Sequence, residues 1–295
     1  MRDMPSATAL MIAESFVFLA RQPRFGALFP ERSIDWFSRF AHEAHGERGC
    51  SREFYAAFWA RVAAVREALS VPGIRLHYVV RKRYIEEKIR AALSEGFEQI
   101  VVVGAGFDTL ALRLAEEFPE ADFFELDHPA TQEVKRRGLD AEAPANLTLV
   151  PVDLRKQMVL DALREVSSFD PDRRTTFIME GLLMYLSAAE VDQLLRSISA
   201  SGGERRVIFS FMERQPRGKI GFRRSTFLTN LWLAWKGEPF RWGLKEQELA
   251  PFLDTRGLTL SARSTSQLLR DRYLHGALSN ERLAEGEHIV VADKS

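Results

Sequence analysis

The spacing of hydrophobic positions changes near residue 97 of this chain. Before that point, apolar residues recur every three to four positions, as in amphipathic helices. The predicted helices of this part span residues 7–20, 33–44, 51–70 and 77–95. Gly96 follows the last of them, a common residue at helix ends. We therefore expect a helical N-terminal cap over residues 1–96 that belongs to the same domain as the rest of the chain.

After residue 97, short apolar runs alternate with helical patterns. The predicted strands span residues 100–103, 122–126, 147–152, 175–179, 206–211, 258–262 and 287–292. The predicted helices span residues 109–118, 129–137, 155–166, 188–199, 245–254 and 266–273. Strands that alternate with helices form parallel sheets. The pattern therefore predicts an α/β core over residues 97–295 with a doubly wound, mostly parallel, seven-stranded sheet.

Residues 213–243 interrupt this alternation, and we interpret them as a lid insertion. The aromatic residues of the segment are Phe222, Phe227, Trp232, Trp235, Phe240 and Trp242. They could cover an apolar substrate, although aromatic residues at such spacings also serve as ordinary packing. Arg223, Arg224 and Arg241 could receive an anionic substrate.

Composition and charge narrow the function classes. Lys+Arg and Asp+Glu both total 41, so the chain lacks the basic excess of a nucleic-acid binder. The sequence contains no run of about 18 uncharged apolar residues, so we expect no membrane span. Cys50 is the only cysteine and cannot form a disulfide within the chain, which favours a cytoplasmic location. His42 and His45 lack the spacing of a helical zinc pair, so we expect no metal.

A glycine turn follows the first predicted strand. Gly104, Ala105 and Gly106 lie between that strand and the next helix, and glycine lets a ligand approach the backbone closely. The turn lies at the carboxyl edge of the predicted sheet, where doubly wound proteins bind ligands. Thr109 stands where a dinucleotide-binding turn has its third glycine, which argues against a nicotinamide cofactor. A purely structural tight turn is the alternative.

Acidic residues occur at the ends of the next three predicted strands. Glu125 and Asp127 lie about 20 residues after the first glycine, where an acid commonly accepts hydrogen bonds from ribose hydroxyls. Asp153 could accept the exocyclic amine of adenine, with the backbone of Leu154 beside it. Glu180 could pair with the ammonium group of a bound amino acid. For the aspartates, a role as an ordinary helix N-cap stays open.

A basic residue near the start of the preceding helix complements these acids. Arg81 could hold the carboxylate of the same amino acid through its bidentate guanidinium.

Four motifs, taken together, resemble the leucine carboxyl methyltransferase family. They are GAGFDT at 104–109, ELDHP at 125–129, DL at 153–154 and EGLLMYL at 180–186. The resemblance covers most of the chain. It implies a class I methyltransferase fold with a helical N-terminal region and a lid, and S-adenosyl-L-methionine as the cofactor. Many bacterial members of the family are O-methyltransferases of small metabolites.

The resemblance also implies roles for individual residues. Arg81 and the glycine turn at Gly104 would contact the methionine part of the cofactor, and Glu180 would bind its ammonium group. Asp127 would hold the ribose, and Asp153 with Leu154 would hold the adenine. Glu125 would not contact the cofactor itself but would support the residues that do.

The chain departs from the family pattern at three positions. Lys82 replaces a threonine after the cofactor arginine, and Glu86 replaces an aspartate. Leu110 stands where an arginine often follows the Asp-Thr pair. The cofactor arginine is retained, whereas the substrate of other members cannot be carried over to this chain.

The acceptor side carries weaker signals. Tyr185 is our candidate for a group near the methyl acceptor, and a buried core tyrosine is the alternative. His128 could act as a base, with a loop role as its alternative. A carboxylate acceptor is already a nucleophile, whereas a hydroxyl acceptor would benefit from a general base.

The sequence thus predicts an O-methyltransferase that acts on a carboxylate or hydroxyl oxygen of a small molecule, with no nucleic-acid or membrane partner. A nicotinamide-dependent oxidoreductase is one alternative. A catalytically idle, partner-binding protein of the same fold is another. The oligomeric state stays open.

Overall fold

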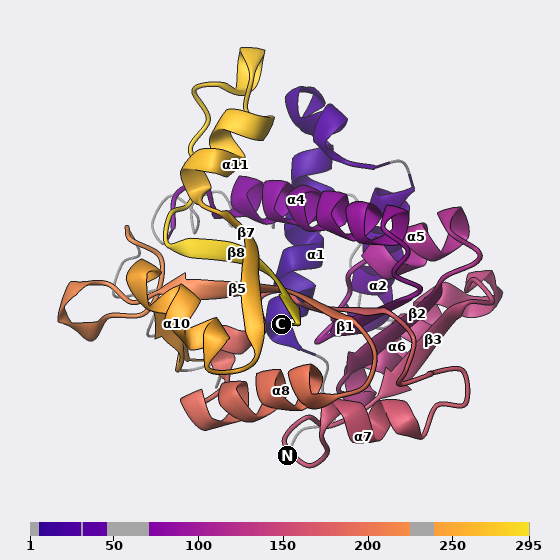
Figure 1. Cartoon of the computed structure of the whole chain (residues 1–295). Coiled ribbons are helices and arrows are strands. Elements are labelled where there is room, and N and C mark those ends of the chain that lie inside the picture. Colours follow the sequence, from indigo (N-terminus) through magenta and orange to yellow (C-terminus); the bar gives the residue numbers. More distant parts are fainter. Residues whose placement is uncertain (1–5, 31, 46–70, 225–238, 295) are drawn as a thin grey trace.

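The computed structural model describes residues 6–30, 32–45, 71–224 and 239–294 (Figure 1). The predicted helix over 51–70, Cys50 and the lid residues Phe227, Trp232 and Trp235 lie outside this part. The first described helices are α1 (Ala7–Ala20), α2 (Ser33–His45) and α4 (Ile74–Ser94), with the 3-10 helix η1 (Pro23–Leu28) after α1. Helix α4 begins one turn earlier than predicted, directly after Gly73.

The remainder of the described chain alternates strands and helices. The strands are β1 (Gln99–Val103), β2 (Asp122–Asp127), β3 (Leu147–Pro151), β4 (Thr175–Met179), β5 (Arg205–Glu213), β6 (Gly243–Leu244), β7 (Leu258–Ser264) and β8 (Glu287–Lys294). The helices are α5 (Leu110–Glu117), α6 (Pro129–Leu139), α7 (Val159–Arg164), α8 (Ala188–Ala200), α10 (Leu249–Asp254) and α11 (Ser266–Tyr273).

These strands form one sheet in the order β3-β2-β1-β4-β5-β8-β7, with β6 paired to the end of β5. Strands β1 to β5 run parallel, and β8 is antiparallel to both of its neighbours. The predicted mostly parallel α/β sheet of seven strands is therefore confirmed. The eighth strand, β6, was not predicted, because two residues are too short to show a period.

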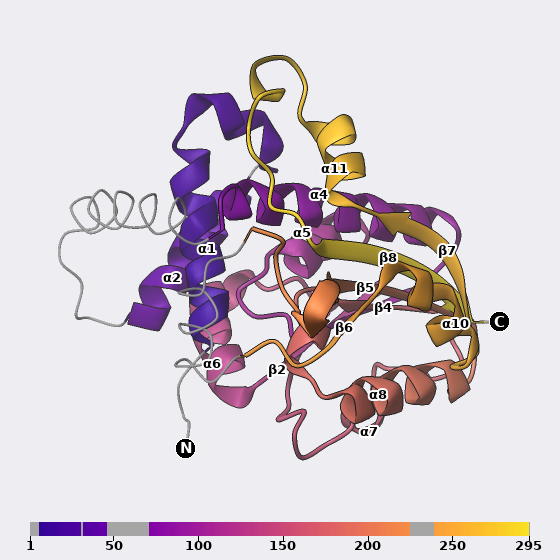
Figure 2. The same ribbon diagram turned by 90° about the vertical axis from the view of Figure 1, so that its left-hand side faces the viewer.

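Helices cover both faces of the sheet (Figures 1 and 2). Alternate residues of a strand point to opposite faces, so Ile100 and Val102 of β1 face one core and Val101 and Val103 face the other. The first core also contains residues of α1, α2, α4, α5, α6 and α11. The second contains residues of α7, α8 and α10. Burial on both faces explains why β1 reads as a continuous apolar run.

Helix α7 is shorter than predicted. It spans Val159–Arg164, whereas the apolar periodicity predicted residues 155–166. The chain before it forms a turn in which the backbone nitrogens of Lys156 and Gln157 donate to the carbonyl of Asp153. The Asp153 side chain also accepts the N–H of Arg155 at 3.2 Å, and such a local bond competes with continued helix.

No helix of the described residues is both long and apolar enough to cross a membrane.

A fully buried ion pair joins α6 to β2. Lys135 Nζ lies 2.5 Å from Glu125 Oε2, and both side chains are 0% exposed. The same ammonium group donates to the carbonyl oxygen of Asp108, which lies just before α5. Burial raises the pKa of Glu125, and the positive charge of Lys135 opposes that rise. The pair therefore fixes α6 against the sheet only while both partners are present.

We expect Lys135→Met to lower the free energy of unfolding by about 3 to 5 kcal/mol, because it leaves Glu125 buried without a counter-charge. Chemical denaturation would measure the loss. Lys156→Met is the control, since the Lys156 side chain is 82% exposed. The double variant Lys135→Met with Glu125→Gln should recover part of the loss. A single variant as stable as the control would contradict this account of the pair.

Candidate functional site

Four of the predicted site residues lie at one edge of the sheet. Val103 pairs with Leu126 and Val102 with Ile178, so β1, β2 and β4 end at the same level. Gly104, Asp127 and Glu180 stand at these ends, and Asp153 follows the neighbouring strand β3. The parallel topology thus brings the predicted residues to a common carboxyl rim.

Asp127 is bound to the glycine turn. Its Oδ2 accepts the backbone N–H of Gly106 at 2.7 Å, and its Oδ1 accepts that of His128 at 2.6 Å. Burial raises the pKa of this carboxyl above its usual range, although both backbone donors lower it. The Thr131 side chain donates to the same carboxylate. A carboxylate has about four acceptor positions, so one is left that could accept a hydroxyl donor. The N-cap of α6 is His128, so the alternative in which Asp127 caps that helix is wrong.

The glycine turn needs its glycines for two reasons. Gly104 and Gly106 have φ angles of +73° and +55°, which side chains disfavour. A Cβ on Gly104 would also lie 3.1 Å from Leu182, and a Cβ on Gly106 would lie 3.0 Å from the Cβ of Ala9. Helix α1 therefore packs directly against the turn.

A cluster of buried charges lies between α4 and the strand ends. Arg81 Nε donates to Glu180 Oε1 at 2.8 Å, and its Nη1 donates to both oxygens of Glu287 at 2.8 Å each. Lys82 Nζ donates to Asp108 Oδ2 at 2.7 Å and to Glu180 Oε2 at 3.1 Å. Burial acts against these charges, but Lys82 lowers the pKa of Asp108, and the two acids raise the pKa of Lys82. The predicted cofactor residues Arg81 and Glu180 thus contact one another.

Glu287 is a member of this cluster that sequence reasoning missed. It is the first residue of β8, has a side chain that is 0% exposed, and also binds His77 Nε2 at 2.8 Å. Burial disfavours its charge, yet Arg81 and His77 hold its pKa well below the usual range. The signal that could have found it is a charged residue just before the apolar run of 289–292 in β8.

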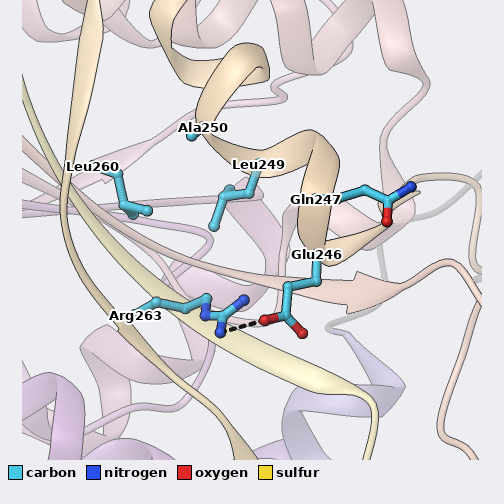
Figure 3. Close-up of a pocket in the computed structure, with 6 residues that line it drawn as sticks. All are labelled: Glu246, Gln247, Leu249, Ala250, Leu260 and Arg263. Atoms are coloured by element: carbon cyan, nitrogen blue, oxygen red, sulfur yellow. Dashed lines mark ion pairs between the residues drawn. The ribbon is translucent and has the colours of Figure 1, made fainter.

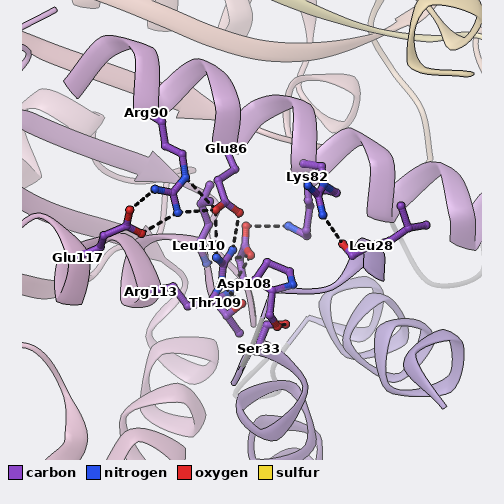
Figure 4. A network of polar contacts seen from close by, with 12 residues as sticks. Leu28, Ser33, Lys82, Glu86, Arg90, Asp108, Thr109, Leu110, Arg113 and Glu117 are labelled. Carbon is purple, nitrogen blue, oxygen red and sulfur yellow. Dashed lines mark hydrogen bonds and ion pairs between the residues drawn. The ribbon is translucent and has the colours of Figure 1, made fainter. Parts of the chain in front are cut away.

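Glu86, one of the three departures from the family pattern, is the centre of a second network (Figure 4). Glu86 of α4 accepts hydrogen bonds from Arg113 at 2.8 Å and from Arg90 at 2.9 Å. Leu110 is buried, and α5 presents its guanidinium one turn later, at Arg113. The network fixes α4, which carries Arg81, against the helix that follows the glycine turn.

Asp153 stands apart from the charge cluster. Its carboxylate accepts hydrogen bonds from Arg155 Nε at 2.9 Å and Nη2 at 3.0 Å. These bonds hold the pKa of Asp153 at about 2. Because α7 begins only at Val159, Asp153 is not the N-cap of that helix. The half-buried Leu154 follows it at the rim.

The predicted acceptor residue lies in an apolar cluster beside the charges, which we call the Phe222 cluster. It consists of Val71, Ile74, Met184, Tyr185, Met212, Ile220, Phe222, Phe240 and Ala284. Tyr185 is half-buried, and its ring centroid lies 5.7 Å from that of Phe240. The rings of Phe222 and His77 are nearly perpendicular, with their centroids 5.8 Å apart. The cluster therefore adjoins the cluster of charges through His77.

Other candidates on the acceptor side have structural partners. Trp242 is buried between Phe211 and Phe252 in the second core, so it packs within the fold. Arg223 forms an ion pair with Glu213 at 2.8 Å, and Arg241 lies 3.5 Å from Glu190. His128 accepts the N–H of Ala130 as the N-cap of α6, which supports its loop role.

A hollow in the surface lies elsewhere, beside α10 and β7 (Figure 3). It is lined by Glu246, Gln247, Leu249, Ala250, Leu260 and Arg263. Arg263 and Glu246 form an ion pair at 2.6 Å across it. None of the predicted site residues lines this hollow.

Comparison with known proteins identifies the relatives of this chain. The family model for leucine carboxyl methyltransferase matches residues 20–199, more than half of the chain. A protein of Mycolicibacterium smegmatis is 42% identical over 125 residues, which cover 41% of each chain. One of Frankia alni is 32% identical over 203 residues, which cover 64% of each chain. Both carry the name of an S-adenosyl-L-methionine-dependent methyltransferase, and the match spans less than two thirds of their length.

The fold is also found among solved structures. A crystal structure from Thermobifida fusca, titled as a methyltransferase, superposes with a TM-score of 0.59 at 15% identity. The match covers 92% of this chain and 98% of that one. The described chain therefore has the class I methyltransferase fold.

The conformation of the glycine turn predicts that a side chain at Gly106 destabilises the protein. We expect Gly106→Ala to lower the free energy of unfolding by at least about 1 to 2 kcal/mol, since a left-handed backbone disfavours a side chain by that amount. Contact with Ala9 adds to the loss. Gly26→Ala is the matched control, because no described atom lies within 4 Å of its added Cβ. Equal stability of the two variants in urea denaturation would contradict the packing of α1 on the turn.

Proposed function

The chain belongs to the leucine carboxyl methyltransferase family, and from this membership we propose that it transfers a methyl group from S-adenosyl-L-methionine to a carboxylate or hydroxyl oxygen of a small metabolite. The relatives named as S-adenosyl-L-methionine-dependent methyltransferases support the cofactor. Family membership does not favour the nicotinamide-dependent alternative. We also propose a cytoplasmic location, because Cys50 is the only cysteine.

The observation that carries this proposal is the charge balance of the buried cluster. Leaving His77 aside, two cations, Arg81 and Lys82, face three carboxylates, Asp108, Glu180 and Glu287. A surplus of negative charge in a buried site suits a ligand with a positive charge, such as a sulfonium. The charged groups of the amino acid part of the cofactor could then replace the ion pair between Arg81 and Glu180. The carboxylate of the cofactor would bind Arg81, and its ammonium group would bind Glu180.

The nucleoside part would lie along the rim. The Asp127 carboxylate has an acceptor position left for a ribose hydroxyl, and Gly106 lets the ribose approach the backbone closely. Asp153 and Leu154 would hold the adenine, once Arg155 has released the carboxylate or shares it. When bound, the cofactor supplies an activated methyl group. The protein aligns the acceptor oxygen behind it and excludes water.

A transfer assay with radiolabelled methyl groups tests the reaction. We expect the purified chain to methylate at least one compound in a panel of small carboxylic acids, phenols and alcohols. Base treatment then identifies the product, because methyl esters hydrolyse readily whereas methyl ethers do not. Peptides with a free carboxyl terminus serve as the comparison panel. Transfer to peptides alone would reject a small-metabolite acceptor, and binding of S-adenosylhomocysteine without any transfer would favour the idle, partner-binding alternative.

The role of Asp127 makes a second prediction. We expect Asp127→Asn to weaken S-adenosylhomocysteine binding by about 1 to 3 kcal/mol, the cost of poorly satisfying a polar group. Protonation of the carboxylate would remove acceptor capacity that a ribose hydroxyl needs. Wild-type affinity should therefore fall as the pH drops through the pKa of Asp127, which burial raises above the ordinary value of about 3.9.

Isothermal titration calorimetry across this pH range measures both effects. Asp122→Asn is the matched control, because Asp122 lies at the opposite end of β2 and pairs with Arg173. Its affinity and pH dependence should match those of the wild type. An Asp127→Asn protein that binds as tightly as the control would remove Asp127 from the cofactor site.

A further inference from the structure

The strongest unexplained feature near the site is the environment of His77. Its side chain is 0% exposed, and Nε2 is bound to the Glu287 carboxylate at 2.8 Å. The other ring nitrogen, Nδ1, is also buried and has no hydrogen-bond partner among the described residues. A buried polar atom without a partner is costly, so its retention needs an explanation.

The Glu287 carboxylate determines which nitrogen of His77 carries a proton. It is ionised, because Arg81 Nη1 donates to both of its oxygens at 2.8 Å and holds its pKa well below the usual range despite its burial. An ionised carboxylate only accepts hydrogen bonds, so Nε2 must carry the proton that lies between the two groups. In the neutral imidazole, Nδ1 then has a free lone pair and can accept a proton.

His77 lies between the donor and acceptor sides of the rim. Glu287 binds both His77 and Arg81, which stand one turn apart on α4, so the imidazole lies beside the proposed methionine site. The imidazole also contacts Phe222, with the two ring centroids 5.8 Å apart and the rings nearly perpendicular. Met212, which pairs with Glu287 in the sheet, belongs to the same apolar cluster.

From this geometry we propose that His77 is the general base that accepts the proton of a hydroxyl acceptor through Nδ1, and that Glu287 is the positioning residue that holds the imidazole. The proposal rests on the proposed function and narrows its acceptor to an apolar molecule with a hydroxyl group, such as a phenol. The acceptor would reach Nδ1 through the Phe222 cluster.

The step balances in atoms and charge. The acceptor oxygen forms a bond to the methyl carbon while the bond from that carbon to the sulfonium sulfur breaks and leaves its electron pair on sulfur. The hydroxyl proton passes to His77 Nδ1. The resulting imidazolium is stabilised by the Glu287 carboxylate, as in other dyads in which an acid orients a histidine.

The charged groups around the imidazole come from three elements. Arg81 lies on the same helix, Glu287 on β8, and Glu180, which follows β4, contacts Arg81 on its far side. The neighbouring Tyr78 has its ring 6.4 Å from that of His77. Any pH dependence of the reaction therefore reports on this set and not on His77 alone.

The test compares wild type and His77→Gln on two acceptor classes. Glutamine can still donate to Glu287 but cannot act as a base. We expect kcat/KM for phenols to fall by about 100- to 10,000-fold, the usual range for a lost general base. The loss should shrink as the pKa of the phenol falls. Carboxylic acids that the enzyme accepts should be unaffected, and S-adenosylhomocysteine should bind with wild-type affinity.

His288→Gln is the matched control. His288 is also buried on β8, and its Nε2 also faces a carboxylate, that of Glu213, at 3.9 Å. Its ring stacks on Phe211, in the core on the opposite face of the sheet. This variant should keep the wild-type ratio of phenol to carboxylate activity.

Nitrogen-15 NMR of the histidine rings gives a readout that does not need activity. We expect His77, identified by the signal missing from His77→Gln, to be protonated at Nε2 and bare at Nδ1. Glu287→Gln should relax this preference, because an amide can accept or donate. A wild-type ring protonated at Nδ1 alone would overturn the proposal.

The kinetic outcomes separate this proposal from the proposed function. Transfer to carboxylic acids alone, or an equal loss on both acceptor classes, would reject the base while leaving the methyltransferase intact. Undiminished transfer to phenols by His77→Gln would also reject it. No transfer by the wild type to any acceptor would overturn the proposed function and this proposal with it.

Discussion

The structure depends on the pairing of one arginine with two buried carboxylates. Arg81 is only 3% exposed, and such a cation is tolerated inside a protein where acids replace the water it has lost. Glu180 follows β4 and Glu287 begins β8, so a single side chain of α4 fixes that helix over both strands. The position of the helix and the charge of the rim are therefore coupled. A ligand that binds Arg81 or Glu180 must exchange with these ion pairs.

The acids at the rim could be predicted, because the carboxyl ends of parallel strands meet at the same edge of a sheet. Each of β1 to β4 is a short apolar run followed by a turn or a helix, and this order places Gly104, Asp127 and Glu180 at one edge. Glu287 could not be placed in this way. It lies 206 residues from Arg81 and enters the rim at the beginning of an antiparallel strand. Its pairing is a long-range contact, which no local period of the sequence specifies.

Sequence reasoning was least accurate where side chains compete with the backbone. The apolar periodicity predicted a helix from residue 155, but the Asp153 side chain accepts the backbone N–H of Arg155 in a local turn, and α7 begins only at Val159. The same competition bears on the candidate site, since the carboxylate predicted to bind adenine is already held by Arg155. Strand ends were therefore easier to predict than the conformations that follow them.

The alternation of β8 explains how two adjacent buried residues have such different surroundings. Successive side chains of a strand point to opposite faces, so Glu287 lies under α4 with Arg81 and His77, whereas His288 stacks on Phe211 in the other core. A shift of one residue in the pairing of β8 with β5 would exchange the two side chains. It would place an imidazole under the guanidinium and remove the carboxylate that compensates it. The register of the antiparallel strand β8 thus determines whether a carboxylate lies at the rim that the parallel strands form. The buried Arg81 in turn disfavours any other register, because it would lose this carboxylate.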